Sequence, residues 1–137
     1  MARTKFPVEV LTPEGEVFAE EVEMISTKTA VGSIGVLAHH QPLLAMLDPT
    51  ELRLYRSDSE VVRYAQGEGY LQMASNHALL LVEEAHAADS LDVGELRERL
   101  QQAERELEQS GEDSERRRVA ERDRSRWETF LQIAQGS

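Results

Sequence analysis

The sequence contains no cysteine, few aromatic residues and no long apolar run. Without cysteine the chain forms no disulfide and offers no thiolate to a metal ion or to a catalytic step. No apolar run approaches the roughly 18 residues that a membrane-spanning helix requires, and residues 1–5 lead directly into a strand-like pattern without the apolar core of a signal peptide. We therefore expect an unexported protein that reaches a membrane only through a partner.

Lysine and arginine are also scarce. The 137 residues include 15 basic and 26 acidic side chains, which gives a formal net charge of -11. Affinity for nucleic acids comes mainly from clustered basic side chains, so the composition argues against a nucleic-acid partner and favours a basic protein partner. A hydrophobic content of 40% is sufficient to bury a core in a chain of this length.

Patterns typical of catalytic and metal sites are missing as well. No serine lies in a G-x-S-x-G setting, and the adjacent carboxylates Glu83 and Glu84 are typical of a solvated strand end. Adjacent residues on a strand point to opposite faces, so His39 and His40 do not chelate one ion without a bend. The sequence therefore predicts no catalytic residue and no metal site.

One stretch, Gly32–Leu47, organises the rest of the chain. Gly32 and Gly35 interrupt an otherwise apolar run and can take a positive φ or let another backbone approach closely. Pro42 fixes its own φ and favours an extended conformation at Gln41. The stretch is neither a plain helix nor a plain strand, and we predict an ordered corner between strands.

Short alternating patterns on both sides of this corner predict many strands. They cover Phe6–Leu11, Glu20–Thr27, residues 52–55, residues 61–64, Tyr70–Ala74 and His77–Glu83. Within the last of these, the run Leu79–Val82 is expected to be buried on both faces. Many short strands with close turns are typical of a sandwich or barrel, so residues 1–89 are predicted to form a β-sandwich domain.

The apolar period becomes helical at about Ser90 and remains so to the end of the chain. Ser90 suits an N-cap, and apolar residues then recur every three or four positions at Val93, Leu96, Leu100, Ala103 and Leu107. Gly111 ends this helix, and a second helix is expected over residues 114–134. Residues 90–137 are thus predicted to form an antiparallel two-helix hairpin.

The hairpin has narrow apolar stripes, with Trp127, Phe130 and Leu131 as the expected anchor of its second helix on the first. Because neither helix has a wide apolar face, the hairpin is expected to lean on the sandwich or on a partner and to move between them. Six arginines also form a local basic stripe, Arg116, Arg117, Arg118, Arg122, Arg124 and Arg126. They form either a solvated face balanced by neighbouring carboxylates or a surface for an acidic partner or a phosphate.

The central stretch carries a resemblance to a known family. Its residues read Gly-Ser-Ile-Gly-Val-Leu over residues 32–37, followed by His40, Pro42 and Leu43. This run resembles the pattern G-x-(I/L)-G-(V/I)-L, then H-x-P-L, of the epsilon subunits of F-type ATP synthases. The turn at residues 12–15 and the two-helix tail also resemble that family, so the resemblance covers nearly the whole chain.

The resemblance implies a non-catalytic rotor subunit of the central stalk. In that family a flattened sandwich of two five-stranded sheets binds the gamma subunit and the ring of c subunits, and thereby couples proton flow to ATP synthesis. The helical hairpin folds against the sandwich or extends to the alpha and beta subunits, where it inhibits ATP hydrolysis. The implied location is the cytoplasmic side of the cell membrane, as a peripheral protein. Interface candidates are Gly32, His40, Pro42, Arg116, Arg122 and Arg126.

Some bacterial members of that family bind ATP through a motif of Ile or Leu, Asp, two variable residues, Arg and Ala. Here Leu91 and Asp92 match its start, but Glu95 and Leu96 stand where Arg and Ala are expected. An anion in place of a cation weakens phosphate binding. The sequence indicates no cofactor, and leaves Asp92, Arg122 and Arg126 as weak candidates for ATP as a regulatory ligand.

A free-standing β-sandwich adaptor that binds a basic protein partner is the alternative. It would use the same sandwich and the same hairpin on a different partner, and a fold by itself does not determine function. The proteins found in complex with this chain separate the two hypotheses, because only the rotor subunit is expected in a complex with gamma.

Overall fold

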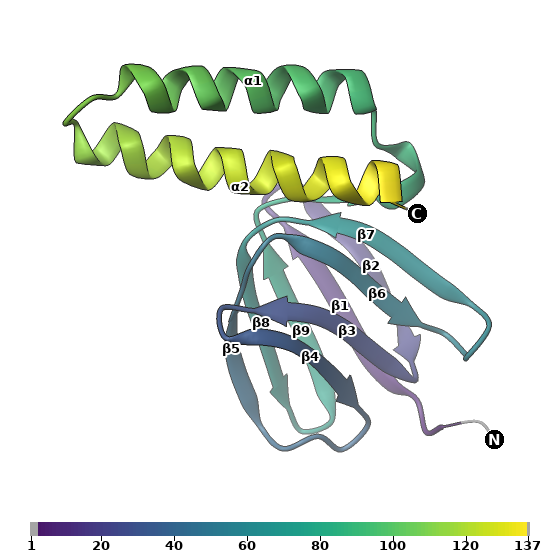
Figure 1. Cartoon of the computed structure of the whole chain (residues 1–137). Helices are drawn as coiled ribbons and strands as arrows, with labels where there is room; N and C mark the ends of the chain where they lie inside the picture. The colour runs from purple at the N-terminus through teal and green to yellow at the C-terminus, as the bar shows by residue number, and fades with distance from the viewer. Residues whose placement is uncertain (1–2, 137) are drawn as a thin grey trace. The chain divides into compact units, whose positions relative to one another are not determined.

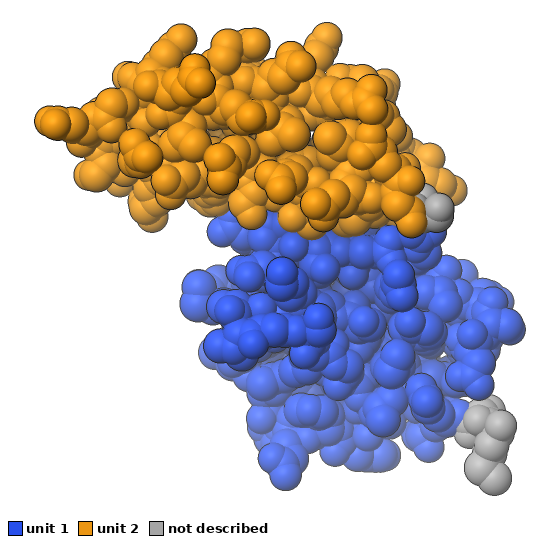
Figure 2. Space-filling model, viewed as in Figure 1, with its two compact units in different colours: residues 1–87 blue, residues 88–137 orange. Residues whose placement is uncertain are grey.

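The computed structural model describes residues 3–136, which divide between residues 87 and 88 into two compact units (Figures 1 and 2). The first unit contains ten strands among the described residues: β1 (Phe6–Thr12), β2 (Gly15–Val22), β3 (Met24–Thr29), β4 (Gly32–Leu37), β5 (Leu43–Leu47), β6 (Thr50–Tyr55), β7 (Val61–Gln66), β8 (Gly69–Ala74), β9 (His77–Val82) and β10 (Ala85–Ala87). The second contains a 3-10 helix, η1 (Ala88–Ser90), and the helices α1 (Val93–Gln109) and α2 (Ser114–Gly136). The domain ranges predicted from the sequence include residues 1, 2 and 137, which lie outside the described residues.

The strands form two layers of five. One layer has the order β10-β7-β6-β3-β4, and the other has the order β5-β8-β9-β1-β2. Between the two layers, the described residues pair only where Thr29 of β3 meets Leu47 of β5. Neighbouring strands run antiparallel except β1 and β9, which are parallel. The predicted β-sandwich followed by a two-helix hairpin is confirmed.

The alternation of buried and exposed side chains along the strands explains why the two layers pack against each other. In β1, Phe6, Val8 and Val10 are fully buried while the residues between them are partly exposed. The same period of two recurs in β3, β6, β8 and β9, since successive side chains of a strand point to opposite faces. The inner faces of both layers share one core, which also contains Phe18, Val22, Ile25, Val36, Leu47, Leu52, Leu54, Leu71, Met73, Ala78, Leu80 and Val82.

The prediction of one strand over Glu20–Thr27 was wrong, because the chain changes layers at Glu23. Val22 ends β2 in one layer, and Met24 begins β3 in the other. Val22 and Ile25 are both buried although they are three residues apart, which a continuous strand does not allow. At the break, the backbone N–H of Glu23 donates to the carbonyl oxygen of Tyr55 at 2.7 Å.

The expectation that Leu79–Val82 is buried on both faces was also wrong. Ala78, Leu80 and Val82 point into the core, but Leu81 is 47% exposed. An antiparallel sheet in a sandwich is covered on its inner face only, so a continuous apolar run in such a strand leaves apolar side chains on the outside.

The corner predicted in Gly32–Leu47 is present and joins β4 to β5. At the other end of β4, in the turn after β3, Gly32 has a φ of 137°, a conformation that favours glycine. His39 also has a positive φ, 63°, and its backbone N–H donates to the side-chain oxygen Oδ1 of Asn76 at 2.7 Å. The corner is therefore fixed by a side chain from the turn between β8 and β9.

A buried polar cluster fixes the far end of the same sheets. Gln66 is fully buried, and its Oε1 accepts a hydrogen bond of 2.6 Å from the hydroxyl of Thr27. Its Nε2 donates to the carbonyl oxygens of Asp48 and Gly67, both at 2.8 Å. A buried amide is tolerated only when its donors and acceptor are satisfied, so the cluster holds the start of the loop after β5 in one position.

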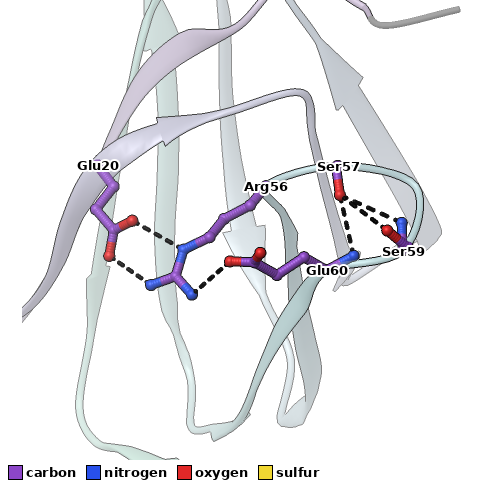
Figure 3. A network of polar contacts seen from close by, with 5 residues as sticks. All are labelled: Glu20, Arg56, Ser57, Ser59 and Glu60. Atoms are coloured by element: carbon purple, nitrogen blue, oxygen red, sulfur yellow. Dashed lines mark hydrogen bonds and ion pairs between the residues drawn. The ribbon is translucent and has the colours of Figure 1, made fainter.

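An ion-pair network connects β2 to the turn after β6 (Figure 3). The guanidinium of Arg56 donates to both carboxylate oxygens of Glu20, at 2.8 and 2.7 Å, and to Glu60 at 3.2 Å. The backbone N–H of Glu60 donates to the hydroxyl of Ser57 at 3.1 Å, which closes the turn. The hydrogen bonds from Arg56 lower the pKa of Glu20, and those to Glu20 and Glu60 raise the pKa of Arg56. The network joins strands of different layers at the edge of the sandwich.

Protonation of Glu51 is expected to make the sandwich less stable in acid. Burial raises the pKa of Glu51, but hydrogen bonds from Arg63, at 2.6 Å, and from Arg53 outweigh it and hold the pKa below its ordinary value of 4.5. A carboxylate with a lowered pKa contributes stability above its unfolded-state pKa and loses it as the pH falls through the folded value. Glu51→Gln should lower the free energy of unfolding by about 1 kcal/mol at pH 7 and by much less at pH 3, as measured in urea. Equal losses at both pH values would contradict this.

The first helix of the hairpin begins later than predicted. Asp92, not Ser90, is the N-cap of α1, because Asp92 has an extended backbone and its carboxylate accepts a hydrogen bond of 3.1 Å from the N–H of Glu95. Ser90 instead ends η1. Gly111 has a φ of 53° just after α1, and Asp113 accepts from the N–H of Arg116 at the start of α2. In the described part of the chain, neither helix has an apolar stretch long enough to span a bilayer.

The two helices run antiparallel and share a small interior (Figure 1). Contacts between Arg116 and Glu106 at one end and between Arg99 and Trp127 further along establish the direction. The buried residues are Leu96 and Ala103 on α1 and Ala120, Phe130 and Ile133 on α2. The interior is much smaller than the core of the sandwich, as the narrow apolar stripes predicted.

Candidate partner-binding surfaces

The outer face of the layer β5-β8-β9-β1 carries large exposed apolar side chains. Leu44 is 72% exposed, Met46 62%, Tyr70 50% and Leu81 47%. Large apolar side chains gathered on one face of a soluble protein mark an interaction surface more often than a solvated one. We refer to Leu44, Met46, Tyr70 and Leu81 as the apolar face.

The strand register places three of these residues in one row. Met46 of β5 lies opposite Tyr70 of β8, and Tyr70 lies opposite Leu81 of β9. Leu11 of β1, which is partly exposed, continues the row as the partner of Leu81. Residues directly opposite on neighbouring strands have Cβ atoms about 5 Å apart, so the row is a continuous apolar strip across four strands.

The predicted interface residues Gly32, His40 and Pro42 are not members of this row and lie near the two ends of β4. Gly32 begins β4 and is partly buried, Pro42 is exposed, and His40 is partly buried with its Nδ1 2.8 Å from the carbonyl oxygen of Gln41. The tip of the β3–β4 hairpin is formed by Val31, which is 98% exposed. The β3–β4 hairpin tip and the β4–β5 corner are therefore two separate exposed areas at opposite ends of β4. The tip adjoins the row, because the backbone N–H of Ala30 donates to the carbonyl oxygen of Met46 at 3.1 Å.

The predicted arginines of α2 have different surroundings. Arg116 is exposed and pairs with Glu106 across the hairpin at 3.2 Å. Arg122 is exposed. Only 11% of the Arg126 side chain is exposed, and its guanidinium lies 2.8 Å from Asp123. Of these three interface candidates, Arg116 and Arg122 are therefore accessible from outside, and Arg126 is mostly covered.

Two guanidinium groups lie close to the ring of Trp127, one from α1 and one from α2. The guanidinium carbons of Arg99 and Arg126 lie 4.9 and 4.6 Å from its ring centroid, which is cation–π distance. The Trp127 ring also meets Phe130 edge to face, with centroids 5.9 Å apart. Trp127 thus contacts α1, as predicted, through the side chain of Arg99.

Comparisons with known proteins show the family of the chain. Residues 5–88 match the family model described as the ATP synthase delta/epsilon chain, beta-sandwich domain. A protein of Sulfurihydrogenibium called ATP synthase epsilon chain is 32% identical over 129 residues, 94% of this chain and 96% of its own length. The chain belongs to the ATP synthase epsilon family. The epsilon chain of Rubrobacter xylanophilus is 38% identical over 113 residues, which are 80% of this chain and 77% of that one.

The fold of this epsilon chain is also found in solved structures. A chain in the OSCP/F1/c-ring structure of the Euglena gracilis mitochondrial ATP synthase superposes with a TM-score of 0.79 at 20% identity, covering 92% of this chain and 79% of that one. At this identity the likeness shows the fold alone. As an epsilon chain, the protein is a stalk or regulatory subunit of ATP synthase and not its catalytic subunit.

Two of the three residues suggested for ATP binding, Asp92 and Arg126, have structural roles in this epsilon chain. Asp92 caps α1, and Arg126 lies against Trp127 and Asp123. A hollow of about 440 Å³ between α1 and α2 is lined by Arg99, Gln102, Ala103, Glu106, Glu115, Arg116, Val119, Ala120, Asp123 and Trp127. It contains more carboxylates than guanidiniums and none of the three ATP candidates, so the hollow does not resemble a phosphate site. The ATP role of Asp92, Arg122 and Arg126 stays a prediction.

Sequence reasoning missed the apolar face. Its signal was present in the uninterrupted run Leu43–Leu47, whose length suits a strand and whose every side chain is apolar. A strand of a sandwich has one inner and one outer face, so such a run necessarily places apolar side chains outside. The same argument applies to Leu79–Val82.

Proposed function

We propose that this epsilon chain is a rotor subunit of the ATP synthase central stalk, which couples proton flow through the c-ring to ATP synthesis and restrains ATP hydrolysis. The observation that carries the proposal is the apolar face on a sandwich whose family is established. A free-standing protein would leave this face in water, whereas a stalk subunit would bury it permanently.

The apolar face is the proposed anchor to the gamma subunit. Met46, Tyr70 and Leu81 stand on paired strands, so binding requires little ordering of the backbone. Tyrosine and large aliphatic side chains at the centre of a flat patch are typical of residues that dominate interface energy. The sandwich is therefore suited to stay bound during rotation.

The turns at the two ends of β4 are the proposed contacts with the c-ring. Val31 stands at the tip of the β3–β4 hairpin, next to Gly32, and the turn that contains His40 and Pro42 follows β4. The Euglena structure comprises a c-ring together with F1, which makes this assembly a natural one for a protein of the same fold. The protein would thus lie at the cytoplasmic side of the cell membrane as a peripheral subunit.

The hairpin is the proposed brake, with the alpha and beta subunits as its partners. Its interior consists of few buried side chains, and its exposed surface includes Arg116 and Arg122. A helix pair with a small interior rearranges at low cost. The arginines would meet acidic surfaces of the catalytic head when the hairpin extends.

The anchor is tested by truncating the apolar face. Tyr70→Ala and Leu81→Ala should each weaken binding of the full chain to purified gamma subunit by about tenfold or more, because each removes a buried apolar contact from the interface. The measurement is isothermal titration calorimetry. Val119→Ala removes an exposed apolar side chain from α2, in the other unit, and should leave gamma binding unchanged. Equal affinities for all four proteins would refute the anchor.

A further inference from the structure

A groove of about 540 Å³ opens at one end of the apolar face. It is lined by Leu11, Thr12, Pro13, Met46, Leu47, Asp48, Glu68, Gly69, Tyr70, Leu81, Val82 and Glu83. The row Met46, Tyr70, Leu81 and Leu11 forms its apolar side, so the groove is continuous with the proposed anchor. Its volume suits one large side chain and the backbone next to it.

The other side of the groove is acidic. Asp48 follows β5, Glu68 precedes β8 and Glu83 follows β9, so three neighbouring strands each bring one carboxylate to the same end of the layer. Asp48 and Glu68 are partly buried and Glu83 is exposed. The residues that line the groove include no lysine and no arginine. The groove thus combines an apolar strip with an acidic rim.

A second hollow extends the acidic rim. It shares Thr12 and Glu83 with the groove and adds Glu14, Glu16 and Glu84. His86 also lines it, with its Nε2 2.8 Å from the carboxylate of Glu84. A cation at the groove would therefore meet an acidic potential that extends past the three rim carboxylates.

We propose that the groove binds a segment of the gamma subunit in which a large apolar side chain is flanked by lysine or arginine. The apolar side chain would lie on Met46, Tyr70 and Leu81, and the cation would face Glu68 and Glu83. The inference rests on the proposed rotor function and adds the chemistry of the partner segment. Complementary charge at the edge of an apolar contact fixes register and excludes wrong partners.

Two other occupants fit the groove less well. A second copy of this chain would bring an acidic surface to an acidic rim, because residues 1–90 hold 6 basic and 14 acidic side chains, a charge of -8. A metal ion needs several ligands around one point, and the described residues contain no group of three His, Cys, Asp or Glu side chains that could hold one. Of the three occupants, the gamma segment with an apolar side chain flanked by lysine or arginine fits the groove best.

The first test compares charge variants of the full chain in binding to purified gamma at different salt concentrations. Glu68→Gln with Glu83→Gln should weaken binding roughly fivefold to twentyfold at 50 mM NaCl and less than about twofold at 500 mM, because salt screens the attraction. The control, Glu21→Gln with Asp58→Asn, makes the same charge change at exposed positions outside the groove and should have little effect. Asp48→Asn with Glu83→Gln repeats the test without changing Glu68, whose Oε1 is buried.

The outcomes separate the groove from the anchor. If Tyr70→Ala weakens gamma binding but both pairs of groove variants bind like the unchanged chain at every salt concentration, the basic segment is refuted and the rotor function stands. If the groove variants lose affinity as the control does, the effect is one of net charge and the inference is also refuted.

Peptides test the groove independently of gamma. The probes are two seven-residue peptides with a central leucine, one flanked by lysines and the other by glutamates, added to the isotope-labelled full chain. The lysine peptide should shift the NMR signals of the Met46 and Leu81 methyl groups and bind about fivefold more tightly than the glutamate peptide at low salt. Equal binding, or shifts elsewhere on the sandwich, would overturn the proposal even if gamma itself does not bind.

Discussion

Replacing Gly69 by alanine is expected to destabilise the sandwich by about 3 kcal/mol or more. A Cβ at this position would overlap the carbonyl oxygen of Leu81 and lie 2.7 Å from the Cα of Val82. Both are backbone atoms of the paired strand β9, so no side-chain rotation relieves the overlap. The strands would have to separate at the point where Tyr70 and Leu81 form the apolar face. Urea unfolding followed by circular dichroism measures the loss, and gamma binding should weaken with it.

Gly94→Ala is the matched control for this prediction. At Gly94, in the first turn of α1, the nearest atom to an added Cβ is Oδ1 of Asp92 at 3.4 Å, an ordinary contact. Alanine also has a higher helix propensity than glycine, by about 1 kcal/mol in a helix interior. The control should be neutral or slightly stabilising. A Gly69→Ala protein as stable as the control would show that β8 and β9 are not as close as the structure has them.

Phe130→Ala is expected to have the largest effect on the hairpin. Phe130 is fully buried, and deleting a buried phenylalanine side chain typically costs about 3–5 kcal/mol. It also removes the ring that meets Trp127 edge to face. Because the interior of the hairpin is small, this loss should open α2 locally while the strands stay folded. Hydrogen exchange should therefore speed up over residues 114–136 and remain slow over Phe6–Val82.

The functional consequence follows from the division into two units. The Phe130→Ala chain should bind gamma with unchanged affinity and inhibit ATP hydrolysis to a different extent from the unchanged chain. Val119→Ala changes a side chain of α2 that is 38% exposed and should alter neither exchange nor inhibition measurably. Faster exchange throughout the strands of the Phe130→Ala protein would contradict the independence of the two units.

The fold could be predicted from the sequence because apolar and polar residues alternate along its strands. The period of two in Phe6–Leu11 is a property of neighbouring residues, and the change to a helical period near Ser90 is equally local. The break at Glu23 could not be predicted from this local alternation. The chain changes layers there, but polar and apolar residues continue to alternate through the break. We predicted Ser90 as the N-cap, and the structure has Asp92 in that position. Serine and aspartate both suit an N-cap, and the sequence does not show at which of them the backbone enters the helix.

The candidate site was predictable only in part. Gly32, His40 and Pro42 were found because they carry a family pattern, and their contacts with a partner stay predictions. The runs Leu43–Leu47 and Leu79–Val82 imply that some apolar side chains point outward, but only the strand order shows that these side chains gather on one face. Arg126 was included in the basic stripe, but a sequence pattern does not show that its side chain stacks on Trp127 and pairs with Asp123.

The most direct test of the rotor and brake account is the ATPase rate of an alpha, beta and gamma complex titrated with two proteins, the full chain and a chain that ends at Ser90. The account predicts that both bind the complex with similar affinity, because both contain the apolar face, and that only the full chain inhibits. Inhibition of equal extent by both would remove the hairpin from the mechanism. Failure of both to bind would contradict the rotor function itself.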